Sequence, residues 1–331
     1  MSLPALLQDR LRLPAIGAPL FIVSHPTLVI EQCKAGIVGS FPALNARPES
    51  ALEEWLTRIT TELDAWQRAH SGRKVAPYAV NQIVHASNAR LAHDLDVCVR
   101  FRVPIMITSL RAPDQVVEAA HAYGGLVFHD VTNLAHARRA LAAGVDGLIL
   151  VCAGAGGHAG RLSPFALVRE VREFYDGTVI LSGAIACGDA ILAAQALGAD
   201  LAYIGTRFIA TQEANASDAY RRMLVDSRAE DIVYTNLFTG VHGNYLRASI
   251  AAAGLDPDNL PSADKSAMDF GSGSSRREKA WRDIWGAGQG TGQIHDVPTT
   301  AELVDRLERE YRAARARLGI AAADGTGGLA A

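Results

Sequence analysis

Short apolar runs rich in β-branched residues alternate along the chain with longer stretches in which apolar residues recur at helical spacing. The short runs have the length and composition of buried strands, and the longer stretches have the period of amphipathic helices. Regular alternation of this kind is typical of parallel strand–helix units. The eight predicted strands are Ala15–Ala18, Gly36–Gly39, Tyr78–Asn81, Ile105–Thr108, Leu126–His129, Gly147–Val151, Val179–Ser182 and Ala202–Gly205.

Several predicted helices end at a glycine, as at Gly124, Gly144 and Gly198, and glycine after the last turn is a common helix stop. Eight strand–helix repeats predict a (β/α)8 TIM barrel, a fold of about 250 residues. A doubly wound open sheet is the alternative, because periodicity alone does not distinguish an open sheet from a closed one. The clearest predicted helices are Ser50–His70, Pro113–Ala122, Ala135–Ala143, Asp189–Leu197 and, at the end, about Thr300–Leu318.

The strand–helix rhythm stops after residue 210. Pro257, Pro261 and the Gly–Ser run Gly271–Ser275 interrupt the pattern, which predicts a small helical subdomain or lid with a mobile loop over residues 211–294. We therefore expect residues 1–210 to form the barrel and 295–320 to complete it. Residues 321–331 are low in complexity and predict a disordered tail.

Composition narrows the class of protein. The 331 residues carry a formal net charge of -3, which argues against a nucleic-acid partner. The cysteines Cys33, Cys98, Cys152 and Cys187 are scattered without metal-ligand spacing, so we expect a reducing compartment, no disulfide framework and no metal site. No signal-peptide pattern opens the chain and no apolar run could span a bilayer. These features predict a cytoplasmic protein without a membrane partner.

The most informative stretch is the glycine-rich run from Val151 to Gly160, which directly follows the sixth predicted strand. Glycines let a backbone approach a ligand closely because they lack Cβ. His158 then places a titratable imidazole at the ligand's face. The alternative is a glycine-rich turn with a solvated histidine.

Two further strand ends suggest a phosphate site. Ser182–Ile185 follows the seventh predicted strand and Gly205–Phe208 follows the eighth, and in barrels the loops after these strands frequently bind phosphate. Ser182 and Thr206 can add hydroxyl donors, although ordinary turns would look the same. At the first strand end, Ala18 and Pro19 offer a small surface for an aromatic ring, and Asn81 could contact the edge of a ring or a phosphate.

Other candidates are weaker. His25, His129, His242 and Tyr245 could contact a substrate, with a surface or structural role as the alternative for each. Cys152 stands where a nucleophile could, but a buried small hydrophobe is the simpler interpretation.

Taken together, these motifs resemble the nitronate monooxygenases, formerly called 2-nitropropane dioxygenases. The resemblance rests on Gly17–Leu20, Val80-Asn81, Ala155–Gly160, Ser182–Ile185, Ile204–Phe208, Val241–Arg247 and Gly286–Gly290. It implies an FMN-dependent (β/α)8 barrel in which His158 is the catalytic histidine. The residues that the resemblance and the strand ends assign to FMN are Ala18, Pro19, Asn81, Val151, Gly156, Gly157, Ser182, Gly183, Ala184, Tyr203, Gly205 and Thr206.

The chain departs from the family pattern in two places. Many relatives carry Glu where this chain has Gly154, and Gln-Gly where it has Val151-Cys152. These differences leave the substrate and the electron donor open.

The expected activity is FMN-dependent oxidation of nitronates or nitroalkanes with molecular oxygen, with His158 as base or substrate orienter. A homodimer is the candidate assembly, and the sequence leaves the oligomeric state open. One alternative is an FMN-dependent enoyl-acyl-carrier-protein reductase that uses NADH or NADPH. The others are an IMP dehydrogenase-like barrel with a nucleophilic cysteine and a catalytically silent flavin- or phosphate-binding protein.

Overall fold

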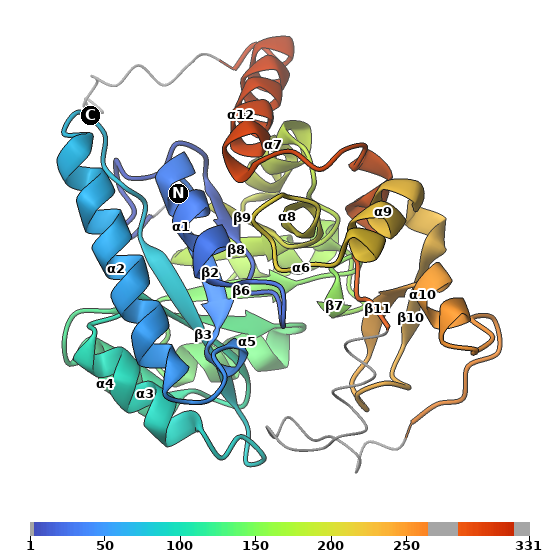
Figure 1. Cartoon of the computed structure of the whole chain (residues 1–331), viewed down its shortest axis with the longest axis horizontal. Coiled ribbons are helices and arrows are strands. Elements are labelled where there is room, and N and C mark those ends of the chain that lie inside the picture. Colours follow the sequence, from blue (N-terminus) through green and yellow to red (C-terminus); the bar gives the residue numbers. More distant parts are fainter. Residues whose placement is uncertain (1–2, 264–283, 321–331) are drawn as a thin grey trace.

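The computed structural model describes residues 3–263 and 284–320, and its core is a barrel of eight parallel strands surrounded by helices (Figure 1). The barrel strands are β1 (Ala15–Gly17), β2 (Gly39–Pro42), β3 (Tyr78–Val84), β4 (Ile105–Leu110), β5 (Leu126–Val131), β6 (Gly147–Val151), β8 (Thr178–Ser182) and β9 (Leu201–Ile204). All eight predicted strands are therefore present, although one is displaced along the chain.

The sheet closes on itself. Its strands run in the order β1-β9-β8-β6-β5-β4-β3-β2, and every pair is parallel. The two ends meet where Ile16 bridges Val38, with hydrogen bonds from Gly17 N to Val38 O (2.8 Å) and from Val38 N to Ala15 O (3.2 Å). Closure confirms the predicted TIM barrel and removes the open-sheet alternative.

The second strand corrects the sequence prediction. It was expected at Gly36–Gly39 but lies at Gly39–Pro42. Gly36 instead ends the preceding helix, with a left-handed φ of 95°, and Val38 makes only the isolated bridge. The pair Ile37-Val38 therefore connects the helix to the strand. Because both residues are apolar, the sequence pattern places the strand too early in the chain.

The helices around the barrel begin and end close to their predicted bounds where they were predicted. They are α1 (Pro26–Ala35), α2 (Ala51–Ala69), α3 (Leu91–Arg100), α4 (Asp114–His121), α5 (Leu134–Ala142), α6 (Pro164–Arg172), α7 (Gly188–Leu197), α8 (Thr206–Ile209) and α12 (Thr300–Arg317). The predicted helices do not include α1, α3 and α8, whereas a helical pattern that ends at Phe174 predicts α6. No helix in the described part of the chain is both long enough and apolar enough to cross a membrane.

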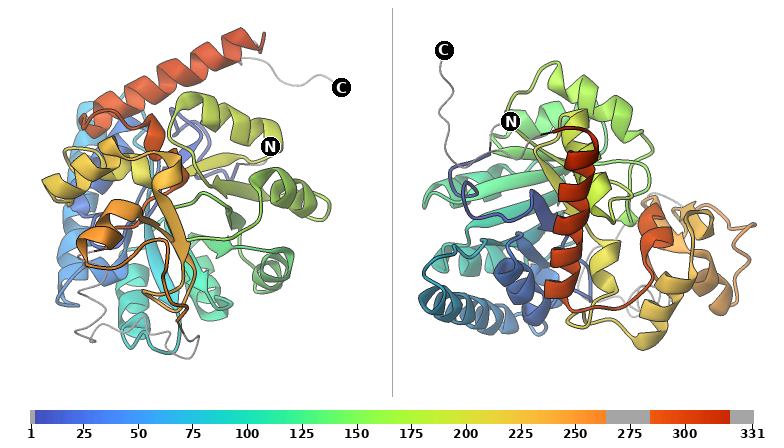
Figure 2. Two further views of the ribbon diagram at one scale, coloured as in Figure 1. Left: turned by 90° about the vertical axis from the view of Figure 1, so that its right-hand side faces the viewer. Right: turned by 90° about the horizontal axis from the view of Figure 1, so that it is seen from above.

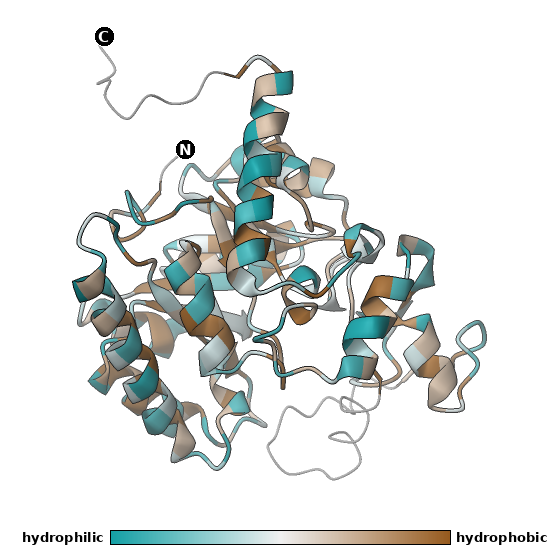
Figure 3. Ribbon diagram, turned by 45° about the horizontal axis from the view of Figure 1, so that its top comes forward, coloured by the Kyte–Doolittle hydropathy of each residue, from teal (hydrophilic) through white to brown (hydrophobic). Residues whose placement is uncertain are grey.

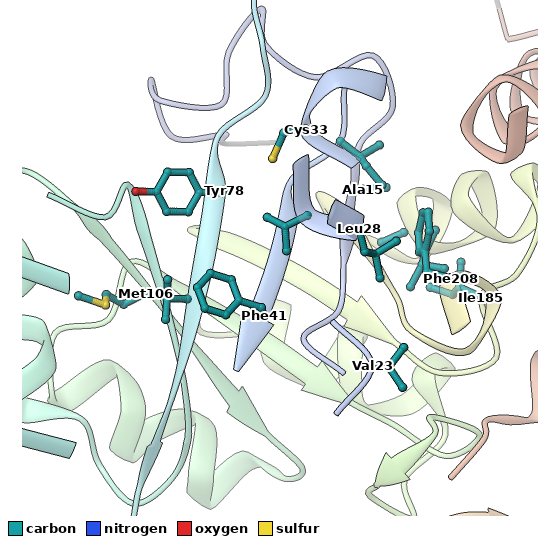
Figure 4. Close-up of a cluster of buried hydrophobic side chains, with 14 of the residues drawn as sticks. Ala15, Val23, Leu28, Cys33, Phe41, Tyr78, Met106, Ile185 and Phe208 are labelled. Carbon is teal, nitrogen blue, oxygen red and sulfur yellow. The ribbon is translucent and has the colours of Figure 1, made fainter. Parts of the chain in front are cut away.

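Two apolar layers hold the barrel together. Alternate strand residues fill the interior, where Ile16, Ile105, Phe128, Ile149 and Ile180 form one cluster. The residues between them face outward and pack against the helices. Figure 4 shows part of this outer layer, with Leu28 and Cys33 from α1 and Phe41 and Tyr78 from the strands. In Figure 3 the helices show hydrophilic residues interspersed with the apolar ones that pack inward.

The C-terminal helix α12 packs back on the barrel, as the sequence predicts. It lies beside α1 and α7 and crosses the molecule in the view from above (Figure 2). A Cβ at Gly188 would stand 2.1 Å from the Tyr311 nitrogen, so a glycine at the start of α7 is what lets the two helices cross so closely. Arg317 pairs with Asp189 across the same contact.

The segment between the barrel and α12 stands at one side of the barrel (Figures 1 and 2). Besides the predicted helices, α9 (Asp218–Asp226) and α10 (Arg247–Ala252), it contains strands β10 (Ile232–Thr235) and β11 (Gly243–Leu246). These strands form an antiparallel sheet with β7 (Gly157–His158), which comes from the glycine-rich run. The predicted loop at Gly271–Ser275 and the predicted tail at 321–331 lie outside the described residues.

Candidate active site

The barrel interior is polar at the carboxyl ends of the strands and apolar in the layers closer to their amino ends. Strand alternation gives the position of each side chain: Asn81 follows Ala79, Ser109 follows Ile107 and Asp130 follows Phe128, each two residues beyond an interior residue. Ser182 and Tyr203 occupy the same face of β8 and β9, where they are paired in register. Polar groups therefore converge at the carboxyl ends of the strands, which is where TIM-barrel enzymes carry their active sites.

A chain of hydrogen bonds links three of these residues. The Asn81 amide donates to Ser109 Oγ (3.2 Å) and to Ile107 O (3.3 Å), and Ser109 Oγ donates to Asp130 Oδ2 (2.7 Å). The bonds from Asn81 to Ser109 and from Ser109 to Asp130 both donate toward the Asp130 carboxyl.

The second oxygen of that carboxyl has no such partner. Asp130 Oδ1 is buried without a hydrogen-bond partner among the described residues, and so is the hydroxyl of Tyr203. Burial raises the pKa of Asp130 to about 7. Burial, and after it the charge of Asp130, also raises the pKa of Tyr203 well above its ordinary value, so the two side chains are electrostatically coupled.

His158 lies on the short strand β7, where it pairs in antiparallel register with Gly243 of β11. Its Nε2 is 3.0 Å from Oγ1 of Thr239, a buried residue just before β11. Burial lowers the pKa of His158 to about 4, so the imidazole is neutral at neutral pH. The attached sheet, rather than the barrel itself, therefore orients this histidine.

The Thr239 contact indicates which ring nitrogen carries the proton. Thr239 Oγ1 donates its hydrogen to Val241 O at 2.9 Å. A hydroxyl has only one hydrogen to donate, so toward His158 the same oxygen must accept. Nε2 of His158 therefore bears the hydrogen, and Nδ1 carries the lone pair.

The glycines of the run that contains His158 serve mainly to pack the chain. A Cβ on Gly156 would stand 2.7 Å from Gly288 N, and one on Gly160 would stand 2.4 Å from Val151 O. Gly154 has a φ of 86°, and its Cβ would meet Gln289 Oε1 at 3.1 Å. Only Gly157 of these four faces open space among the described residues. The close approach of the Gly286–Gly290 segment therefore explains Gly154 and Gly156. From the sequence alone, these glycines were expected to make room for a ligand.

The predicted phosphate loops lie on neighbouring strands. Ser182–Ala184 ends β8 and Gly205-Thr206 ends β9. Ala184 has a left-handed φ of 54°, which costs a non-glycine residue energy and is typical of functional loops. Thr206 Oγ1 accepts from Gly288 N at 2.9 Å, which leaves its hydrogen available to donate.

At the end of β1, the half-buried Ala18 and Pro19 adjoin these loops. A Cβ on Gly205 would lie 3.6 Å from Ala18 Cβ. Val151 belongs to the interior cluster. The residues predicted to bind FMN are thus gathered at one end of the barrel, while their contacts with a cofactor stay predicted.

Two predicted substrate residues lie elsewhere. His129 faces out of the barrel, on the same side of β5 as Val127 and Val131, and its Nδ1 is 2.8 Å from Thr108 Oγ1. His25 precedes α1, where its ring lies 4.7 Å from that of Trp55. Neither position supports the predicted contact with substrate. For His129 the reason is strand alternation, since Phe128 and Asp130 point inward.

The other two predicted substrate residues lie beside His158. The ring of His242 is exposed and stacks on Tyr234, while its carbonyl accepts from Ala159 N at 3.2 Å. Tyr245 is buried against Phe238, and its hydroxyl interacts with Thr239. Tyr245 therefore belongs to the support of His158.

Cys152 is fully buried in the outer apolar layer, and burial raises its thiol pKa to about 12. This supports the small hydrophobe and weighs against the IMP dehydrogenase-like alternative, which needs a thiolate. In the described ranges no group of three or more His, Cys, Asp or Glu could hold a metal ion.

Three residues of the site were missing from the predicted set: Ser109, Asp130 and Thr239. Strand alternation could have found Asp130, because an interior Phe128 places residue 130 inside. No local signal marks Thr239, which lies 81 residues from the histidine that it contacts.

Residues 48–310 match the sequence model of a family described as nitronate monooxygenase, which is more than half of the chain. The chain belongs to the nitronate monooxygenase family. A nitronate monooxygenase of Paraburkholderia phytofirmans is 29% identical over 90% of this chain and 92% of that protein. Members of the family are flavin-dependent oxidoreductases, so the chain is an enzyme of that kind.

Solved structures agree on the fold. The nitroalkane oxidase from Streptomyces ansochromogenes superposes with a TM-score of 0.76 at 26% identity, over 95% of this chain and 100% of that one. FabK from Thermotoga maritima gives a TM-score of 0.75 at 22% identity, over 95% and 96%. At that identity the FabK likeness shows the barrel fold alone.

Proposed function

We propose that this member of the family binds FMN and oxidises nitronates with molecular oxygen, with His158 as the residue that meets the substrate. The observation that carries the proposal is the His158–Thr239 contact. It holds a neutral imidazole of one tautomer within the glycine-rich run that follows β6.

Features of the described residues fit a flavin. The loops Ser182–Ala184 and Gly205-Thr206 would hold the phosphate, and Ala18 with Pro19 would lie against the ring. Two buried polar atoms, on Asp130 and Tyr203, lack partners and face the barrel interior. When bound, the flavin supplies the electron acceptor for the oxidation.

His158 is better suited to an anionic nitronate than to a neutral nitroalkane. A base whose pKa is lowered to about 4 has little driving force to remove a proton from carbon. A nitronate has already lost that proton, and its negative charge would raise the pKa of a neighbouring imidazole. His158 would then hydrogen-bond the anion and orient it.

The domain division and the assembly are part of the same proposal. Residues 1–210 and 295–320 would form the catalytic barrel, and 211–294 would act as a lid that also carries the support of His158. A homodimer stays a prediction. The Gly154 and Val151-Cys152 departures leave the size of the nitronate open.

The test uses purified protein loaded with FMN, after a visible spectrum has shown that the flavin is bound. Anaerobic mixing with propyl-2-nitronate should bleach the flavin rapidly, and oxygen should restore its colour. Bleaching by NADPH, followed by reoxidation with an enoyl thioester and no response to the nitronate, would overturn the proposal in favour of a reductase.

A further inference from the structure

Two buried polar atoms that face the barrel interior lack hydrogen-bond partners among the described residues. The Tyr203 hydroxyl belongs to β9 and Asp130 Oδ1 belongs to β5, and strands β8 and β6 lie between these two in the sheet. Tyr203 as a whole is only 7% exposed. A buried polar atom without a hydrogen-bond partner is energetically costly. Two in one place indicate that a ligand completes them.

The hydrogen-bond chain shows what Asp130 can offer that ligand. Ser109 donates to Oδ2 of Asp130, so this oxygen is the acceptor of the carboxyl. A protonated carboxyl then carries its hydrogen on Oδ1, the oxygen that has no partner. Burial raises the pKa of Asp130 to about 7, which keeps a large share of the molecules protonated at neutral pH.

Tyr203 offers a second donor beside it. Its pKa is raised well above the ordinary value, so the hydroxyl keeps its hydrogen. A ligand that hydrogen-bonds to both groups needs acceptor atoms along one edge. It must also be flat, because the interior layer beneath these groups is filled by Ile149, Ile180 and Leu201. Carbonyl oxygens and ring nitrogens of a heteroaromatic ring have this character.

We propose that Asp130 and Tyr203 form a donor pair in the floor of the site that hydrogen-bonds acceptor atoms of the flavin ring. The inference rests on the flavin part of the proposed function. It adds two ring-binding groups and assigns Asn81 and Ser109 to positioning Asp130.

The pair is tested by flavin affinity instead of turnover. Apoprotein is titrated with FMN, and the dissociation constant and the visible spectrum of the complex are recorded for each variant. Asp130→Ala and Tyr203→Phe should each weaken FMN binding by about tenfold, the effect of losing one buried hydrogen bond. Asp130→Asn should stay within about threefold of the parent, because its amide can donate where the carboxyl did.

Tyr175→Phe is the matched control. Its hydroxyl also donates a hydrogen bond, part-buried and 3.1 Å long, to Asp146 O, but it lies among the residues packed on the outer layer. This variant should bind FMN like the parent. The melting temperature of each apoprotein shows whether a variant has folded.

Parental FMN affinity and spectrum in all three site variants would overturn the inference and leave the proposed function intact. Equal losses in Asp130→Ala and Asp130→Asn would also overturn it, since donation would not be what matters. An apoprotein destabilised by Asp130→Ala, with unchanged FMN affinity, would show that the chain itself completes these atoms. Failure of the parent to bind FMN at all would refute the proposed function as well.

Discussion

Two histidines of this barrel share a lowered pKa and a threonine neighbour but lie in quite different places. Burial lowers the pKa of both His158 and His129 to about 4, and each ring lies beside a threonine hydroxyl. Thr239 donates its hydrogen to Val241 O, and Thr108 donates its hydrogen to Phe128 O at 3.3 Å. Each threonine therefore accepts from its histidine, through Nε2 in His158 and through Nδ1 in His129.

The difference lies in what surrounds each ring. His129 sits between the sheet and the helices, in the layer that holds Val127 and Val131. His158 sits on a strand that joins the barrel to the attached sheet. A shifted pKa therefore marks burial in both cases, and only position distinguishes a catalytic candidate from a packed histidine.

Removing His158 should have the largest effect. We expect His158→Ala, loaded with FMN, to lose about 10²- to 10³-fold in kcat/KM for a nitronate, the range for one polar catalytic group. Its melting temperature should fall less than that of His129→Ala, because His158 is only partly buried, whereas His129 is 4% exposed. Steady-state oxygen consumption measures the loss, and undiminished turnover would remove His158 from the mechanism.

His129→Ala should show the opposite pattern. Deleting a buried ring leaves a cavity and removes one of the two hydrogen bonds of the Thr108 hydroxyl, which should cost about 2–3 kcal/mol in the free energy of unfolding. Activity per folded molecule should stay at the parental value. Urea unfolding and oxygen consumption on the same samples separate the two effects. A loss of kcat/KM like that of His158→Ala would mean that position does not divide the two residues.

Thr239 tests whether orientation contributes to the role of His158. Thr239→Val removes the acceptor that fixes the Nε2–H tautomer and should lower kcat/KM by about tenfold, consistent with the loss of one hydrogen bond. Thr239→Ser keeps the hydroxyl and should recover most of the activity. ¹⁵N chemical shifts of His158 should report a mixed tautomer only in the valine variant. A serine variant as slow as the valine variant would point to packing by the Thr239 methyl group.

The two histidines also show how much of the fold and of the site the sequence can predict. Short apolar runs predict seven of the eight strands near their observed bounds and place the second too early in the chain, and the glycine-rich run makes His158 the candidate catalytic residue. At the end of β5 the strand period of two places Asp130 inside the barrel and His129 outside it, because Phe128 is an interior residue. The support of His158 was not predictable, because Thr239 reaches it through pairing of β7 with β11, which no local pattern encodes.

Folding stability should depend on pH through these same groups. In the unfolded chain both imidazoles titrate near about 6.5. In the folded protein the pKa of each is lowered to about 4, so the unfolded chain binds two more protons between these values. Their contribution to stability is complete above about pH 6.5 and is lost as the pH falls toward 4. Asp130 opposes them, because its pKa is raised to about 7 and the folded protein keeps that proton through the same window.

The net difference from the three groups is one proton, so they should make the apoprotein lose about 1.4 kcal/mol per pH unit in this window. His129→Gln removes one histidine and should bring this contribution close to zero, whereas Asp130→Asn removes the opposing carboxyl and should double it. Urea unfolding at pH 7, 6 and 5 measures each slope, and differences between variants cancel the titration of all other groups. An unchanged slope in His129→Gln would mean that this ring is not desolvated, and the two histidines would then differ in environment as well as in position.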